Sequence, residues 1–400
     1  MFKTMTRNLL ELSDWIAELG VTDVAMESTG VLWKPVYNIL EDRFRVLLCN
    51  ARHIKNVPGR KTDIKDCEWI AQLLQHGLLT ASFVAHRPIR DLRDLTRQRA
   101  QIISERTREI NRVHKILEDA NIKLGAVASD IMGKSGRDML RALIAGRQKP
   151  AEMAELARRS LRGKTPEVRE ALRGHVTDHH RYMLKVHMEH IEYLERLMDE
   201  LTARIDELLI SRLSSPSETS EEKIAEDKGE PSPLPFNRAV ELASELPGID
   251  VKSAQDVLAE IGTNMSQFPT AEKLAAWARI CPGNNESAGK RKNGHTGQGN
   301  RWLRRALTQV AWAASRTKGT YLAAHYRRIA GRRGKKRAVI ALSHTILVIL
   351  YHMLKHHRHF NELGEDFFDR LNPERIKLYH VKRLESLGFK VHLEKQEEAA

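Results

Sequence analysis

Cysteine is scarce in this chain, since only Cys49, Cys67 and Cys281 occur among its 400 residues and no two of them form a CxxC pair. The sequence therefore lacks the cysteine spacing of a disulfide framework and of a structural zinc site. It also lacks an uninterrupted apolar run near the ~18 residues that a membrane-spanning helix needs, and its N-terminus has no signal-peptide core. We expect a cytoplasmic protein without a membrane partner.

Acidic residues are outnumbered by basic ones, because 66 Lys and Arg stand against 52 Asp and Glu and give a net charge of +14. Each Lys or Arg placed against a phosphate releases condensed counterions, so such a balance favours a polyanionic partner. Ribosome-associated and membrane-surface proteins share the same balance. At 400 residues the chain exceeds one ordinary core and should form two or more domains.

Strand and helix patterns alternate at the N-terminal end. Apolar runs at Val21–Met26 and Phe44–Cys49 predict buried strands, and helices are expected over Trp33–Leu40 and from Thr62 to Leu74. This alternation is typical of an α/β layer with some parallel pairing. Only two strands are visible, and two strands do not make a stable sheet.

Long helices and a polar linker follow. Apolar spacings of three and four predict long helices at Ile89–Ala120 and Arg181–Leu213, as a coiled coil or an antiparallel hairpin. Packing within one chain and dimerisation are equal alternatives. The Ser-, Pro- and Glu-rich segment Ser214–Pro235 predicts a disordered acidic linker. The expected divisions are an α/β domain, the long helices, the linker, a basic domain and a tail, at 1–85, 86–213, 214–235, 236–359 and 360–400.

Three carboxylates occupy positions that suit a divalent cation. Glu27 ends a buried strand, while Asp63 and Asp66 lie three residues apart at a helix start and so share one face. Mg²⁺ takes oxygen ligands and completes its shell with waters and substrate phosphates. The structural alternative is that an Asp at a helix N-terminus complements the helix dipole and that Glu27 is merely solvated.

The residues around these carboxylates carry a stronger signal. MESTG at Met26–Gly30 and NARHIKNVPGRKTDIKDCEWIAQLL at Asn50–Leu74 resemble the N-terminal domain of the DEDD-type insertion-sequence transposases, the IS110 family. That domain is similar to the RuvC Holliday-junction resolvase and has an RNase H-like fold. The resemblance implies that Glu27 is the family's Glu and that Asp63 and Asp66 are its DxxD, as ligands of Mg²⁺.

The first Asp of the family pattern has no counterpart here. It belongs on a strand well before the Glu, whereas the only earlier aspartates are Asp14, in the first expected helix, and Asp23, just ahead of the Glu27 strand. Two explanations are open: the true start lies upstream, or the copy is decayed and inactive. In either case we expect a truncated RuvC-like domain that lacks its first strands.

Cations dominate the C-terminal part. From Ser287 to Arg337 there are fifteen Lys or Arg and no Asp or Glu, with Trp302, Trp312 and Tyr326 among them. A phosphate backbone explains this run better than a solvated protein face does. The residues expected to bind nucleic acid are Lys290, Arg291, Lys292, Arg301, Arg304, Arg305, Arg332, Arg333, Lys335 and Lys336.

A serine stands at the head of this run, in the Gly- and Asn-rich loop NESAGKRK. Ser287 would need nearby cations to stabilise its alkoxide and the charge that develops at phosphorus, and Lys290–Lys292 follow it directly. A lone serine in such a loop is ordinarily a turn residue. NESAGK followed by GN and LRRAL, however, resembles the C-terminal domain of the same transposases, which implies that Ser287 is the nucleophile.

Another segment of this basic part has the pattern of a helix–hairpin–helix that grips a DNA phosphate through backbone N–H groups. This is LPGIDVKSAQDVLAEIG, at Leu246–Gly262. Asp250 replaces the usual second glycine and brings a negative charge near the expected phosphate. A plain packing role for the segment is therefore at least an equal alternative.

The resemblance as a whole implies a recombinase that excises and inserts a mobile element. It would act as a dimer or tetramer on element ends and target DNA in the bacterial nucleoid, guided by a structured RNA. The Arg-rich helix Ile89–Ala120 is either the RNA contact or a solvated amphipathic helix. A RuvC-like metal-dependent endonuclease without a serine intermediate and an inactive DNA-binding remnant are the alternatives. The expected fold is mixed and mostly α, with a truncated RNase H/RuvC-like α/β domain, a long coiled-coil hairpin and an all-α basic domain.

Overall fold

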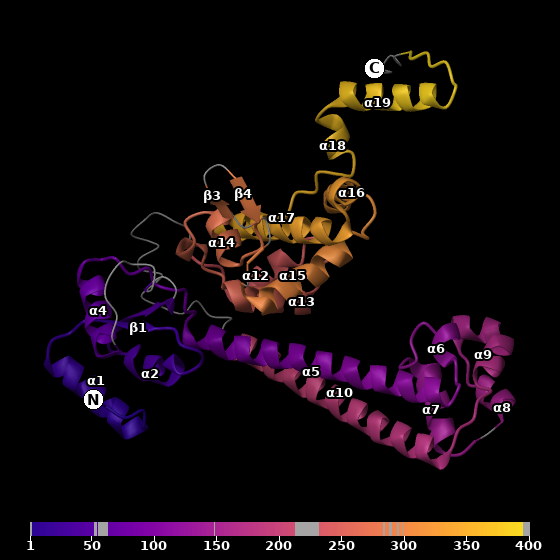
Figure 1. Ribbon diagram of the computed structural model, residues 1–400, viewed down its shortest axis with the longest axis horizontal. Coiled ribbons are helices and arrows are strands. Elements are labelled where there is room, and N and C mark those ends of the chain that lie inside the picture. The colour runs from indigo at the N-terminus through magenta and orange to yellow at the C-terminus, as the bar shows by residue number, and fades with distance from the viewer. Residues whose placement is uncertain are drawn as a thin grey trace. The chain divides into compact units, whose positions relative to one another are not determined.

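The structure is a computed structural model whose described residues are mostly helical, which confirms the mostly-α expectation (Figure 1). They divide into two compact units, Met1–His86 and Arg87–Ala400. The described residues are 2–51, 54, 63–147, 149–212, 232–282, 285–287, 290–293, 296–297 and 299–394. Only the backbone is described at 63–66, 212, 285–287, 290–293 and 375. Most of the expected linker, 214–231, lies outside these ranges.

The first unit contains a parallel strand pair. Strand β1 (Asp23–Glu27) pairs with β2 (Arg45–Cys49), in register from Asp23 opposite Arg45 to Glu27 opposite Cys49. The predicted parallel pairing is therefore confirmed. The helices of this unit are α1 (Thr6–Glu18), α2 (Trp33–Leu40) and α4 (Asp63–Gln75).

Helix α4 packs on this sheet through its apolar side chains. Trp69, Ile70 and Leu73 contact Leu47 and the fully buried Cys49 of β2. These apolar contacts determine which face of α4 lies against the strands. The acidic positions 63 and 66, at the start of α4, lie on that same face.

The second unit begins with two long antiparallel helices, α5 (Arg87–Asp119) and α10 (Asp178–Arg212). Their pairing is antiparallel because Arg106 contacts Glu195 while Asp119 contacts His180. The two helices thus pack on each other within one chain. Short helices close their far end around a common core: α6 (Leu124–Val127), α7 (Lys134–Ile144), α8 (Pro150–Ala154), η1 (Arg159–Lys164) and α9 (Thr165–Ala171).

A helical bundle follows around α17 (Lys335–His356), whose Leu342, Ile346 and Leu350 are fully buried. Among the described residues, α17 alone is long and apolar enough to cross a membrane, but 56% of its most apolar window is buried, as in the core helix of a domain. The surrounding helices are α12 (Phe236–Ala243), α13 (Val251–Ile261), η2 (Met265–Gln267), α14 (Ala271–Trp277), α15 (Arg301–Ala314) and α16 (Tyr321–Arg333).

Two short strands interrupt this bundle, so the all-α expectation for the basic domain is wrong at this point. Strand β3 (Asn285–Ser287) pairs antiparallel with β4 (Lys290–Asn293). The segment was expected to be an open loop because its Gly and Asn residues are typical of turns. Antiparallel backbone pairing of the two strands instead forms a hairpin.

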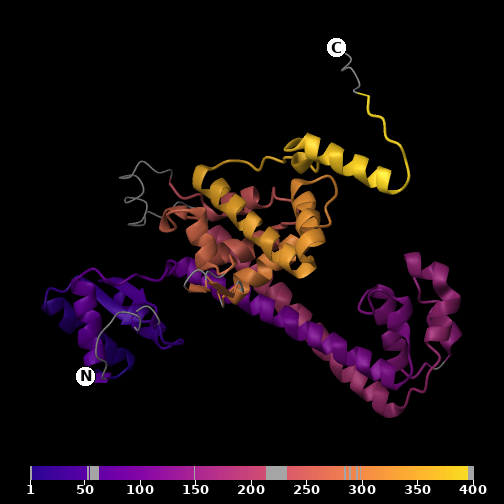
Figure 2. The same cartoon turned by 45° about the horizontal axis from the view of Figure 1, so that its top comes forward.

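The tail forms α18 (Phe367–Arg370) and α19 (Pro373–Ser386), drawn in yellow in Figure 2. Its start packs on α16, because the ring of Phe368 stacks on those of Tyr321 and His325 at centroid distances of 5.4 and 5.6 Å. Residues 360–394, whose role the sequence does not reveal, thus include a segment that covers part of α16.

Candidate nucleic-acid interface

One of the three predicted metal ligands has a described side chain. Glu27 ends β1 half-buried, and its Oε1 accepts a hydrogen bond of 3.0 Å from the Thr29 hydroxyl. Asp63 and Asp66 begin α4, and their side chains lie outside the described residues. Helical spacing places positions 63 and 66 on the face that carries Ile70 and Leu73, which packs on the sheet. Among the described residues, no three His, Cys, Asp or Glu lie close enough together to hold a metal ion.

The two earlier aspartates are engaged elsewhere. Asp14, on α1, forms an ion pair of 2.6 Å with Arg43. Asp23 begins β1, at the opposite end of the strand from Glu27, and contacts Thr22 and Arg45. These two hydrogen bonds, the one from Thr22 being the larger cause, lower the pKa of Asp23. The sequence placed Asp23 just ahead of the Glu27 strand, whereas the structure makes it the first residue of that strand, at the end opposite Glu27.

The hairpin β3–β4 positions Ser287. The backbone register sets Ser287 opposite Lys290 and Glu286 opposite Arg291. The side chains of Ser287, Lys290, Arg291 and Lys292 lie outside the described residues. Directly opposite residues of an antiparallel pair have Cβ atoms ~5 Å apart. The fold thus brings the serine and the first lysine of the cationic run to adjacent backbone positions.

The three predicted arginines of α15 differ in what they contact. Arg301 is exposed, and its guanidinium lies 4.6 Å from the ring centre of Trp302. Arg304 donates to the carbonyl oxygens of Arg279 and Gly297, at 2.7 and 2.6 Å. Arg305 donates to the carbonyl oxygen of Ala100 at 2.7 Å and so joins α15 to α5. Arg301 is therefore the most available of the three to an external phosphate.

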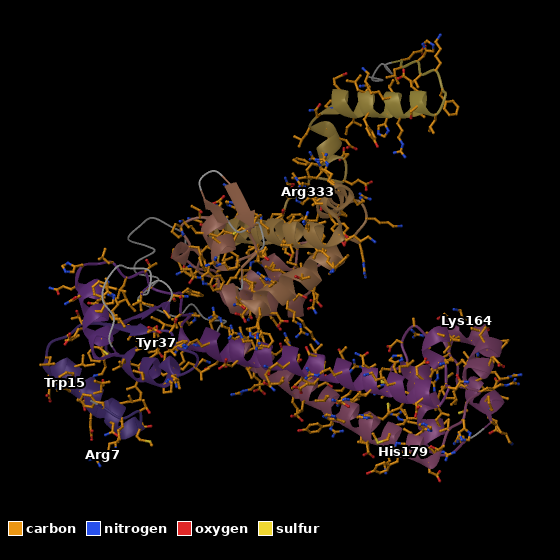
Figure 3. The ribbon with its side chains drawn as sticks, viewed as in Figure 1. Arg7, Trp15, Tyr37, Lys164, His179 and Arg333 are labelled. Carbon is orange, nitrogen blue, oxygen red and sulfur yellow. The ribbon has the colours of Figure 1, made fainter. Side chains whose placement is uncertain are left out.

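The other predicted cations surround the break between α16 and α17. Arg332, Arg333, Lys335 and Lys336 are all exposed, and Gly334 between them has a φ of 81° (Figure 3 labels Arg333). No side chain caps the N-terminus of α17, so its first N–H groups and the helix dipole add to the positive potential. This cationic junction, residues 332–337, presents charge that suits a phosphate backbone.

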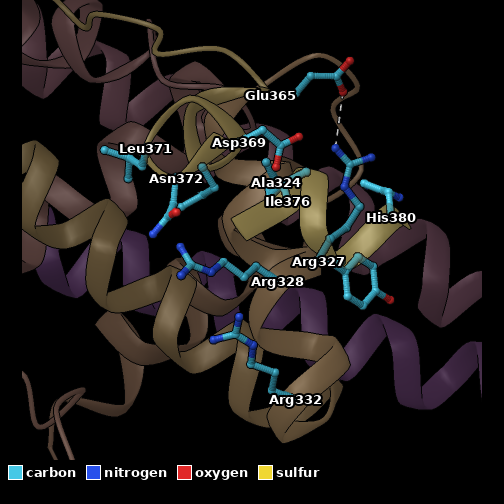
Figure 4. A pocket seen from close by; sticks show the side chains of 12 residues that line it. Ala324, Arg327, Arg328, Arg332, Glu365, Asp369, Leu371, Asn372, Ile376 and His380 are labelled. Atoms are coloured by element: carbon cyan, nitrogen blue, oxygen red, sulfur yellow. Dashed lines mark hydrogen bonds and ion pairs between the residues drawn. The ribbon is translucent and has the colours of Figure 1, made fainter. Parts of the chain in front are cut away.

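The tail places acidic side chains near arginines of α16, including Arg332 of the cationic junction. A cavity of about 740 Å³ lies between α16 and the tail, with Arg327, Arg328 and Arg332 on one side and acidic Glu365 and Asp369 on the other (Figure 4). Arg327 forms an ion pair of 3.3 Å with Glu365, and the guanidinium of Arg328 lies 4.7 Å from the ring centre of Phe368. Because these acidic side chains offset some of the arginines, α16 presents less positive charge than its number of arginines suggests.

Several arginines of α5 that were candidates for RNA contact face the protein interior. Arg97 makes two hydrogen bonds of 2.7 Å to the carboxylate of Glu260 on α13, and Glu260 is 1% exposed. Arg93 donates to the carbonyl oxygens of Ala259 and Glu260, and burial lowers its pKa to about 10 although Glu260 opposes the shift. Arg99 pairs with Asp256 at 2.8 Å. These arginines hold α5 against α13.

Sequence reasoning missed the role of Asn300. Its side-chain oxygen accepts from the N–H groups of Trp302 and Leu303 and caps α15, while its amide donates to Glu260 at 2.5 Å. An Asn before an amphipathic helix is a recognisable N-cap signal in the sequence. Its bond to Glu260, forty positions earlier, depends on the tertiary structure.

The segment with the helix–hairpin–helix pattern adopts a packed turn. Asp250 caps α13 with an extended φ of −96° and accepts a hydrogen bond from the Ser253 N–H, so the position needs no glycine. The hydrogen bond from Ser253 lowers the pKa of Asp250. Gly248 has a φ of 90°, and a Cβ there would lie 2.5 Å from the Ala314 nitrogen. The turn packs closely on α15, and the Asp250 carboxylate caps the N-terminus of α13.

Comparison with known families matches both ends of the chain. Residues 2–122, which contain Glu27, Asp63 and Asp66, match a DEDD family described as Transposase. Residues 240–327, which contain Ser287, match the family described as Transposase IS116/IS110/IS902. No curated protein matches the chain. The acidic N-terminal segment and the basic serine segment together confirm the resemblance read from the sequence: the chain belongs to the IS110 family of transposases.

Proposed function

We propose that this transposase cuts and rejoins DNA through Ser287, with Mg²⁺ held by Glu27, Asp63 and Asp66. The observation that carries the proposal is the register of the hairpin, which sets Ser287 opposite Lys290. A serine needs such cationic neighbours, because both its alkoxide and the phosphorane that it forms carry negative charge. The exposed cationic junction supports binding of the DNA backbone in the same unit.

The proposed step balances as a phosphoryl transfer. The Ser287 hydroxyl oxygen attacks the phosphorus of a DNA phosphodiester, the bond from phosphorus to the leaving DNA oxygen breaks, and the serine proton is transferred to that oxygen. A hydroxyl oxygen of the second DNA strand then attacks the phosphorus of the phosphoserine, the bond from phosphorus to the Ser287 oxygen breaks, and the proton of the attacking hydroxyl passes to the Ser287 oxygen. No external energy source is needed, because one phosphate ester replaces another at each step.

The donor set of the first unit fits a hard divalent cation. Glu27 lies at the carboxyl end of β1, whose residues are all half-buried, and positions 63 and 66 continue the face of α4 that packs on the sheet. Carboxylate oxygens are the ligands that Mg²⁺ prefers. When bound, Mg²⁺ would neutralise the charge of a DNA phosphate. This set supports the RuvC-like assignment of residues 1–85, which is part of the proposal.

The proposal also includes partners and assembly. A structured guide RNA would pair with donor and target DNA, and the protein would act as a dimer or tetramer. Ser287 and the carboxylates belong to different compact units. We propose that the complete site forms between protomers, so that mixing Ser287→Ala with Asp63→Ala protein should restore part of an activity that each variant lacks alone.

The test is a covalent adduct. The full chain is expressed with the insertion sequence and its neighbouring noncoding RNA, and denatured lysate is examined for protein-linked DNA. The wild-type chain should give an adduct that maps to Ser287, and Ser287→Ala should abolish it while leaving DNA affinity within about twofold, because Lys and Arg provide the phosphate contacts. An adduct that persists in Ser287→Ala would show that another residue is the nucleophile, whereas cleavage by that variant without an adduct would support a RuvC-like hydrolase.

A further inference from the structure

The cationic surface of the second unit extends from the cationic junction onto α16. Arg328 and Arg332 are four positions apart and so share one face of the helix. Arg332 is the first residue of the junction, and it lines the same cavity as Arg327 and Arg328 (Figure 4). Neither α16 nor the junction contains an Asp or a Glu. The three arginines therefore continue the cationic surface of the junction along α16.

The tail occupies this part of α16 through two kinds of contact. The carboxylate of Glu365 forms an ion pair of 3.3 Å with Arg327. The guanidinium of Arg328 lies 4.7 Å from the ring centre of Phe368. Arginine binds carboxylates and phosphates in the same way, and its flat guanidinium stacks on nucleic-acid bases as it does on aromatic rings. The tail thus contacts these arginines with groups that resemble those of a nucleic acid.

Most of the polar contacts that hold the tail are open to solvent. The side chains of Arg327 and Glu365 are 60% and 57% exposed, and ion pairs in such an environment add little to stability. Glu362 accepts a hydrogen bond of 2.7 Å from the Tyr321 N–H, and it is exposed as well. A DNA backbone that lies on the junction presents further phosphates to α16 and releases condensed counterions there. Phosphates and tail carboxylates repel each other, so the two cannot share the same arginines.

We propose that Arg327, Arg328 and Arg332 bind the phosphate backbone of DNA, and that the tail occupies them until DNA displaces it. The tail then limits the affinity of the chain for DNA, because these three phosphate contacts form only after Glu365 and Asp369 have moved away. The proposal requires DNA binding, which membership of the transposase family implies. It does not depend on the serine chemistry.

The first measurement is the affinity of the full chain for a short duplex DNA, by fluorescence anisotropy at constant ionic strength. Glu365→Gln combined with Asp369→Asn removes the two carboxylates at nearly constant side-chain size and should raise the affinity about tenfold. The matched control, Glu374→Gln combined with Glu385→Gln, removes two exposed carboxylates of α19 that do not line the cavity. It should raise the affinity by no more than about twofold. Equal increases would overturn the proposal, because net charge alone would explain them.

Arginine variants distinguish a DNA contact from a tail contact. In the Glu365→Gln, Asp369→Asn chain, Arg327→Ala combined with Arg328→Ala should weaken DNA binding about tenfold, because the arginines there bind DNA alone. In the wild-type chain the same pair also removes the contacts that hold the tail, so the loss should be no more than about threefold. Equal losses in the two chains, or no loss in either, would show that the tail and DNA do not compete.

Hydrogen exchange follows the tail itself in the wild-type chain. The segment 360–371 contains Glu362, whose carboxylate accepts from the Tyr321 N–H, and Phe368, which stacks on the Tyr321 ring at 5.4 Å. This segment should exchange faster when duplex DNA is bound, because it loses its packing on α16. Slower or unchanged exchange would mean that the tail stays in place, against the proposal. Ser287→Ala should behave as the wild-type chain in all three measurements, so a failure of the serine chemistry would leave these results unaffected.

Discussion

Helix α5 and the cationic junction at residues 332–337 are both rich in arginine, yet the fold uses them in opposite ways. On α5, Arg93 and Arg97 meet the buried carboxylate of Glu260, and Arg106 meets Glu195 at 2.8 Å. At the junction, Arg333 and its neighbours are exposed. The first group holds helices together, and the second presents charge to the solvent.

The difference follows from where the acidic residues lie. The partners of α5 come from α13 and α10, which are distant in the sequence but adjacent in the fold. From Ser287 to Arg337 the chain has no Asp or Glu, so local partners are impossible there. Tail residue Glu365 reaches Arg327 on α16. Arginine content alone therefore does not identify a nucleic-acid surface. An arginine is available to a phosphate only if no acidic residue of the folded chain already pairs with it.

The largest effect is expected from removing Glu260, the buried carboxylate that contacts the arginines of α5. Glu260→Ala removes the buried carboxylate that Arg93 and Arg97 contact, and we expect the free energy of unfolding to fall by about 3–5 kcal/mol. Urea unfolding followed by circular dichroism measures this change. The matched control is Glu241→Ala, which removes an exposed pair with Arg238 and should cost no more than about 1 kcal/mol. If both variants lost the same free energy of unfolding, burial would not explain the difference between the Glu260 contacts and the exposed Glu241 pair.

Replacing basic residues by alanine should weaken DNA binding when the residues belong to the cationic junction, and should leave it unchanged when the residue lies on α5. Arg333→Ala combined with Lys335→Ala should lower the slope of log affinity against log salt by about 2 for duplex DNA, because two phosphate contacts are lost. Arg108→Ala removes an exposed arginine of α5 and should leave the slope unchanged. Fluorescence anisotropy from 50 to 300 mM salt measures both slopes. An equal decrease for Arg108→Ala would assign α5 to the nucleic-acid surface after all.

A smaller effect is expected at the start of α13, the helix that also carries Glu260. The folded pKa of Asp250 lies below its ordinary value of 3.8, so its stabilisation is present above that value and is lost as the pH falls through the folded pKa. Asp250→Ala should cost about 1 kcal/mol at pH 7. The difference from wild type in urea midpoint should shrink towards pH 3. A difference that stays constant over this range would show that the carboxylate charge does not contribute.

Periodicity predicted the long and regular elements closely. The expected helix Arg181–Leu213 is α10, Asp178–Arg212, and the expected strand Phe44–Cys49 is β2, Arg45–Cys49. Such elements are visible in the sequence because one face is buried along their whole length. The hairpin β3–β4 was not predicted, since its residues are typical of loops and its pairing depends on a register that composition does not contain.

The sequence by itself determined the family, the helical character, and the candidate residues Glu27, Asp63, Asp66 and Ser287, because these depend on motifs and on local periodicity. Only the tertiary structure decided which cations remain available. It assigned Arg97 to Glu260 and left Arg333 exposed, and it placed Arg327 and tail residue Glu365 in one cavity. The physical reason is that charge pairing and cavity formation depend on distances in space, and residues 163 positions apart in the chain can lie 2.7 Å apart in the fold.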